Sequence, residues 1–133
     1  MKNVFMLSLS LLLFSCGQES GVNTANPVLN TPAVGNTPNS FGYSLNANAF
    51  TVEDFYTLSF SSDSLSIGIT VTGYVSGEGM VEILGEADSV IYSMSLNRNI
   101  ALGETTLHGL TPQRVHLVFN KYSGSVAVAV SGK

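Results

Sequence analysis

Alternating apolar and polar residues dominate the chain after residue 40. The segment Leu65–Val71 places Leu, Ile, Ile and Val at every second position, and Val126–Val130 does the same with valine. Because successive side chains of a strand point to opposite faces, this period of two predicts strands with one buried face. Two further segments alternate in the same way, with Val90, Tyr92, Met94 and Leu96 on one expected face and Val115, Leu117 and Phe119 on another. Strands are also expected in ranges that follow the pattern less strictly: 41–45, 55–60, 80–84 and 105–107.

Turn-forming residues separate these expected strands. They are Ser61-Ser62-Asp63, Ser76-Gly77-Glu78-Gly79, Glu86-Ala87-Asp88, Asn97-Arg98-Asn99, Thr111-Pro112 and Ser123-Gly124. The turns recur every 10 to 15 residues or so, with no long helical pattern between them, which is typical of all-β domains. The sequence predicts a single antiparallel β-sandwich of seven to eight strands, jelly-roll or Ig-like. A small barrel is the alternative.

The expected strand faces opposite the core carry small and almost uncharged residues. They are Ser66, Gly68, Thr70 and Thr72 in one strand, Ser89, Ser93 and Ser95 in another, and Ala127 and Ala129 in the last. Charged residues make up 11% of the chain, against about 25% in ordinary soluble domains. Two interpretations stay open: a Ser/Thr-rich surface that faces solvent, or a flat face covered by another strand, a partner protein or a glycan.

The start of the chain has the pattern of a secretory signal. Lys2 precedes an apolar run from Val4 to Phe14, which is 11 residues long. A helix needs roughly 20 apolar residues to span a bilayer, so this run is too short to remain as a membrane span. A basic start followed by a short apolar centre predicts that residues 1–15 are a cleaved signal peptide.

The tetrad Leu13-Phe14-Ser15-Cys16 closes this signal, and it resembles the lipobox of bacterial lipoproteins. The resemblance implies that the Cys16 thiol receives a diacylglyceryl group, that the signal is cut before Cys16, and that the new N-terminus is acylated, with palmitate for example. Gly17 stands where an aspartate would favour inner-membrane retention, so the resemblance implies the outer membrane. Cys16 is the single cysteine, so no intrachain disulfide can form.

Residues 16–40 have the composition of a tether. They contain Pro27, Pro32 and Pro38, three glycines and repeated Asn and Thr. Such a segment cannot bury enough apolar surface to offset the entropy of ordering it, so a disordered linker is expected. Residues 41–133 then remain for one β-sandwich domain.

The C-terminal stretch LTPQRVHLVFNKYSGSVAVAVSGK is similar to the closing hairpin of secreted bacterial β-sandwich modules. These include jelly-roll carbohydrate-binding domains and pre-peptidase C-terminal-type domains. The resemblance covers about 24 residues, is architectural, and carries no functional residue to this chain.

Charge and residue pattern argue against several kinds of chemistry. Without the signal the chain carries four basic and nine acidic residues, which is unfavourable for nucleic acid. His108 and His116 are too few to hold zinc by themselves, and no Gly-x-Ser-x-Gly elbow accompanies the many serines. The acidic pairs are Glu53-Asp54, and Glu86 with Asp88. We interpret them as solvated turn residues, because neither pair resembles a calcium-binding loop. We therefore expect no catalytic residues, no metal and no cofactor.

Exposed aromatic residues would be needed for a glycan platform, and the chain contains no Trp. Tyr74 and Tyr122 lie near expected loops and are the candidate ligand-stacking residues, with burial at a sandwich edge as the alternative.

The leading hypothesis is a lipid-anchored cell-envelope lipoprotein whose β-sandwich is a non-catalytic binding or structural module. Its partners would be the membrane, through the lipid, and an envelope protein or glycan. The rival hypotheses are a carbohydrate-binding module at the cell surface and a small hydrolase.

The lipid anchor generates the first prediction. Cys16→Ala removes the thiol that would carry the lipid. The apolar run of the signal, from Val4 to Phe14, is too short to hold the protein in a bilayer by itself. The variant should lose incorporation of labelled palmitate and leave the membrane fraction for the soluble one. Unchanged membrane partition of Cys16→Ala would contradict the anchor.

Overall fold

Six antiparallel strands and one short 3-10 turn make up residues 28–133, the part of the chain that the computed structural model describes. The strands are β1 (Ala33–Thr37), β2 (Ser40–Thr57), β3 (Ser64–Leu84), β4 (Val90–Ser95), β5 (Ile100–His108) and β6 (Arg114–Gly132), and the turn is Glu86–Asp88. Within residues 28–133, the structure contains no helix with the length and apolar character needed to cross a membrane. The signal peptide and Cys16 lie outside the described residues, so both stay predictions.

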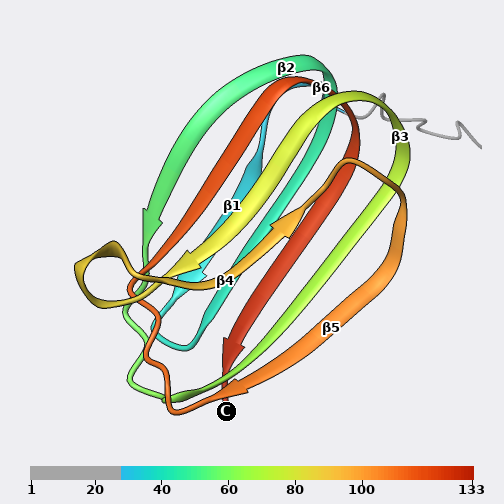
Figure 1. Ribbon diagram of the computed structural model, residues 1–133. Coiled ribbons are helices and arrows are strands. Elements are labelled where there is room, and N and C mark those ends of the chain that lie inside the picture. The colour runs from blue at the N-terminus through green and yellow to red at the C-terminus, as the bar shows by residue number, and fades with distance from the viewer. Residues whose placement is uncertain (1–27) are drawn as a thin grey trace, which may run out of the picture.

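The strands form one sheet in the order β1-β2-β6-β3-β4, and β5 also pairs with β3. β2, β3 and β6 are 18 to 21 residues long, and all three arch over at the same end of the molecule (Figure 1). Each therefore contributes one half to each of two layers. This confirms the predicted all-β antiparallel sandwich, built by folding a single sheet in two.

The pairing registers define the two layers. One layer has five strand segments in the order β1, first half of β2, second half of β6, first half of β3, β5. The other has four, in the order second half of β2, first half of β6, second half of β3, β4. The expected seven to eight strands are mostly halves of these longer strands.

Left-handed backbone conformations mark the places where the long strands bend. They occur at Ala49 in β2, at Gly73 and Gly77 in β3, and at Lys121 and Gly124 in β6. The pairing register shifts at the same places, as it does in β-bulges, which sharpen the bend of a strand. Ser76-Gly77-Glu78-Gly79 and Ser123-Gly124 were predicted to be chain reversals. They are bends instead, because each strand continues into the other layer.

The core lies between the layers and consists of the residues that the alternation predicted. All of Leu65, Ile67, Ile69, Val71, Val115, Leu117, Phe119, Val126, Val128 and Val130 are buried. No polar or charged residue of the described part is buried with them. Val90 departs from the prediction, because it lies at the start of β4 and is exposed.

The end of the expected linker is structured. β1, at residues 33–37, pairs along its length with residues 40–44 of β2, and Leu29 forms a bridge with Asn46. The disordered linker expected over residues 16–40 therefore does not reach Ser40. Composition misled here because every residue of β1 is exposed: the strand is held by backbone hydrogen bonds to the edge of β2, which need no apolar side chains.

The bends of β3 and β6 pack closely against each other, and two hydrogen bonds tie the β2 bend to β6: the Ala49 N–H donates to Ser123 Oγ and the Lys121 N–H donates to Thr51 Oγ1. A Cβ atom on Gly77 would overlap the carbonyl oxygen of Lys121, and one on Gly124 would lie 3.1 Å from the Cα of Tyr74. Tyr122 fills the space beneath them, with its ring centroid 5.1 Å from that of Phe119. Close backbone approach thus requires glycine where β3 and β6 turn over.

Substitution of Gly77 should therefore be costly. Gly77 has a φ of +89° and faces backbone atoms, so Gly77→Ala should lower the free energy of unfolding by about 3 kcal/mol. Gly42→Ala is the matched control, because nothing lies within 4 Å of a Cβ there, and it should change stability by less than about 1 kcal/mol. Urea unfolding measures both. Equal effects would contradict the close packing of the bends.

Candidate functional site

The outer face of the five-stranded layer is built of small, uncharged residues along its three central strands, β2, β6 and β3. β6 runs along its centre, and the register sets Gly42 and Gly68 on either side of Ala129. This confirms the face that the sequence predicted for Ser66, Gly68, Thr70, Thr72, Ala127 and Ala129. We call it the small-residue face and define it as the outward residues of β2, β3 and β6 in this layer: Ser40, Gly42, Ser44, Asn46, Ser66, Gly68, Thr70, Thr72, Ser125, Ala127, Ala129 and Ser131.

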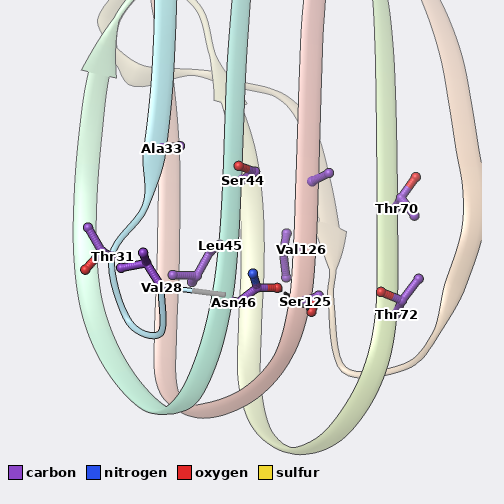
Figure 2. A pocket seen from close by; sticks show the side chains of 11 residues that line it. Val28, Thr31, Ala33, Ser44, Leu45, Asn46, Thr70, Thr72, Ser125 and Val126 are labelled. Carbon is purple, nitrogen blue, oxygen red and sulfur yellow. Dashed lines mark hydrogen bonds between the residues drawn. The ribbon is translucent and has the colours of Figure 1, made fainter. Parts of the chain in front are cut away.

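A shallow pocket of about 380 Å³ lies on this face, near the bends. Its floor comes from outward residues of three neighbouring strands, including Ser44, Thr70 and Ala127, and the segment that leads into β1 forms one side with Val28 and Thr31. Figure 2 shows these side chains around the pocket, with Thr70 and Thr72 on the side across from Val28. The volume falls in the range of small-ligand sites.

Hydrogen-bonding groups line the pocket, and none of its lining residues is ionisable. The Ser125 hydroxyl donates to Asn46 Oδ1 at 2.7 Å (Figure 2), which leaves the Asn46 amide nitrogen as a donor toward the pocket. Asn46 is also fixed through its backbone, since its carbonyl oxygen accepts from the Asn30 N–H at 2.8 Å. The pocket can therefore bind a neutral ligand through hydrogen bonds, but it has no group for acid-base chemistry or for metal binding.

The small-residue face is bounded by strand β5 on one side. Leu102 extends over Gly68, with its Cδ1 atom 4.0 Å from where a Cβ would stand. Glu104 lies opposite Gly68 in the register and accepts a hydrogen bond from Ser66 Oγ at 3.3 Å. The Glu104 carboxylate thus lies on the edge strand β5, outside the small-residue face.

The outer face of the four-stranded layer is different, because it carries a cluster of charged side chains. His116 on β6 lies between two carboxylates from the neighbouring strands, with Nδ1 2.9 Å from Glu82 Oε2 and Nε2 3.0 Å from Glu53 Oε1. This arrangement ties β2, β6 and β3 together. Sequence analysis placed His116 on an outward face but did not pair it, because Glu53 and Glu82 are 63 and 34 residues away along the chain.

Phe55 and Arg114 extend this cluster. The Phe55 ring stacks on the imidazole of His116 with centroids 4.1 Å apart. The Arg114 guanidinium also lies over the Phe55 ring, 5.2 Å from its centroid. Arg114 also forms an ion pair with Asp88. The charged side chains of this cluster thus interact with one another. Among residues 28–133, no group of His, Cys, Asp and Glu is arranged to hold a metal ion.

His108, the other histidine, lies beside a serine. Its Nδ1 atom is 3.0 Å from Ser64 Oγ, across the pairing of β5 with β3. A nucleophilic serine needs such a base, but it also needs a group that orients the base and a site for substrate. In the described structure no carboxylate bonds to His108, and neither residue lines the pocket on the small-residue face.

Tyr74 and Tyr122 do not form a ligand-stacking platform. Tyr122 is fully buried, and its hydroxyl donates to the Leu96 carbonyl at 2.9 Å. Burial raises the pKa of its hydroxyl to about 12. Tyr74 is half-buried, packs against Tyr122 at 5.7 Å between centroids and donates to the Gly77 carbonyl. A buried Tyr122 cannot stack on a ligand, and both rings support the bends, which is the alternative of burial that the sequence left open.

Comparisons with known proteins show likeness of fold only. No protein-family model and no curated protein matches the chain. A solved chain from Bacillus endospore appendages, described as a novel family of disulfide-linked pili, is 9% identical with a TM-score of 0.45, covering 77% of this chain and 90% of that chain. A CBM4 structure is 8% identical with a TM-score of 0.34, covering 77% of this chain and 86% of that chain. At these scores neither likeness bears on what this chain binds.

The two buried tyrosine hydroxyls give a matched pair of variants. Tyr122→Phe removes the donor to the Leu96 carbonyl, so it should lower the free energy of unfolding by about 1–2 kcal/mol. Tyr43→Phe should be neutral or stabilising, because the Tyr43 hydroxyl is buried without a hydrogen-bond partner among the described residues. Thermal unfolding measures the difference. A loss of stability in Tyr43→Phe as large as in Tyr122→Phe would contradict this account of the core.

Proposed function

We propose that the protein is a lipid-anchored, non-catalytic binding module of the cell envelope, whose small-residue face is the binding surface. The lipid at Cys16 follows from the lipobox resemblance and holds the module at a membrane, with the outer membrane favoured by Gly17. The sandwich supplies a rigid platform. The partner is a neutral surface, a protein or a glycan of the envelope.

One observation carries this proposal: a broad, flat face without a charged side chain along β2, β6 and β3. Such a face costs little to cover, because no ion must be desolvated, and its backbone can be approached closely at Gly42, where nothing lies within 4 Å of a Cβ. The opposite layer presents Glu53, Glu82, His116 and Arg114, which would have to lose water on binding. The small-residue face is the surface that favours a neutral partner.

The proposed absence of catalysis is supported by the same geometry. The pocket on the small-residue face has no ionisable lining residue. The Ser64 and His108 pair lacks an orienting acid among the described residues. A reaction would need a positioned acid, base or nucleophile beside a substrate site.

Site-directed photo-crosslinking in intact cells tests the binding face. A photoreactive residue at Ser44, on the small-residue face, should capture a discrete partner, whereas one at Ser95, on the outside of β4, should not. Ala127→Arg places a large cation at the centre of the face and should abolish capture from Ser44, because it adds both bulk and charge. Ser93→Arg, on the other layer, is the control and should leave capture intact. Equal capture from Ser95 would contradict the proposal.

The pocket favours a carbohydrate as the second candidate partner. Its hydroxyls and the Asn46 amide match the neutral, hydroxyl-rich surface of a sugar. Binding would depend on hydrogen bonds, since no aromatic residue lines the pocket. Retention of the full-length protein on insoluble polysaccharide should fall at least several-fold in Thr72→Val, which keeps the shape and removes the hydroxyl. Retention unchanged by Thr72→Val would count against this candidate.

A further inference from the structure

Exposed apolar side chains gather at the end of the sandwich where the long strands bend. Val75 in the β3 bend is 77% exposed, and Val28 and Leu29, where the described chain begins, are 68% and 53% exposed. Leu29 and Val75 line the same surface hollow, together with Asn48 from the β2 bend. Single exposed apolar residues are ordinary, but a group of them indicates an interaction surface.

Basic residues accompany this apolar group. Lys121 lies exposed in the β6 bend, and Arg98 is exposed in the loop between β4 and β5, which Asn97 and Asn99 tie to the bends through the N–H groups of Gly79 and Tyr74. We call this surface the bend end and define it by Val28, Leu29, Asn48, Val75, Arg98 and Lys121. Glu78 is the acidic residue nearby, paired in register with Asn120.

The opposite end of the sandwich, the loop end, carries acidic residues together with Arg114 and Lys133. Asp63 lies in the loop before β3, and Glu86 and Asp88 lie in the 3-10 turn that follows β3. The C-terminal residue is also there, because the Lys133 N–H donates to the Ser64 carbonyl at 2.8 Å. The loop end thus mixes three acidic residues with two basic ones, whereas the bend end combines its apolar residues with Lys121, Arg98 and a single acidic neighbour, Glu78.

The described chain begins at the bend end. Leu29 bridges to Asn46, and Asn30 bonds to the backbone of Asn48. Residues 17–28 connect Cys16 to this end, and twelve residues cannot span more than about 40 Å even when fully extended. A lipid at Cys16 would therefore attach the domain to the bilayer through the bend end.

We propose that the bend end docks onto the surface of the lipid bilayer. Val28, Leu29 and Val75 reach into the headgroup region, while Lys121 and Arg98 face lipid phosphates. This docking rests on the lipid anchor of the proposed function. The anchor makes the contact intramolecular, so a few side chains are enough to orient the domain. The small-residue face then stands upright on the membrane, open to partners from the side.

Fluorescence quenching by brominated lipid tests the docking. The full-length lipidated protein is labelled at Asn48→Cys in the bend end or at Asp63→Cys in the loop end, and it is reconstituted in phosphatidylethanolamine and phosphatidylglycerol vesicles with brominated acyl chains. Half of a long strand sets the two ends about 25–30 Å apart. The label at residue 48 should be strongly quenched, and the label at residue 63 should not be quenched.

Matched charge variants identify the side chains responsible. Val75→Asp should remove most of the quenching at residue 48, because it puts an anion against the bilayer. Val90→Asp should leave the quenching unchanged, because Val90 is 57% exposed at the loop end. Equal quenching of the two labels in protein that floats with the vesicles would overturn the docking and leave the anchor standing. Protein that does not float with the vesicles would overturn the anchor and the docking together.

Discussion

The close packing of three strand bends is the constraint on which the rest of the structure depends. β2, β3 and β6 each run through both layers, so the sheet can close over its core only if all three turn at the same level. Glycine at residues 77 and 124 allows the bent backbones to approach, and the buried Tyr122 fills the space beneath them. Long-range pairing holds the halves in register: β6 pairs with both β2 and β3 on either side of its bend.

This folding gives the domain two unlike faces and two unlike ends. The five-stranded layer turns small, uncharged residues outward, whereas the four-stranded layer carries the ion pairs of His116 and Arg114. All three bends lie at one end, beside the start of the described chain, and the acidic loops lie at the other. The proposed binding face and the proposed membrane-docking end are therefore adjoining parts of the same sheet. They meet at Val28, which lines the pocket and also belongs to the bend end.

Much of the fold could be predicted from the sequence, because strict alternation reports directly on burial. Leu65–Val71 and Val126–Val130 gave both the core and the small-residue face. The sequence could not distinguish a bend within one continuous strand from a chain reversal between two strands. Glycine and serine at residues 76–79 are compatible with both, and only the pairing with neighbouring strands decides between them. β1 was missed because its exposed side chains carry no apolar pattern. The pocket and the Glu53, His116, Glu82 cluster depend on strands far apart in the chain, which no local pattern brings together.

The continuity of β6 through both layers is tested most directly by interstrand nuclear Overhauser effects in the folded protein. The account predicts that Val130 shows contacts to both Phe41 and Ile67, and that Leu117 shows contacts to both Asp54 and Val81, all within one molecule. A mixed sample of isotope-labelled and unlabelled chains separates contacts within a molecule from contacts between molecules. Absence of the Val130 contacts or of the Leu117 contacts would contradict a single sheet folded in two. Contacts that appear only between molecules would contradict it as well.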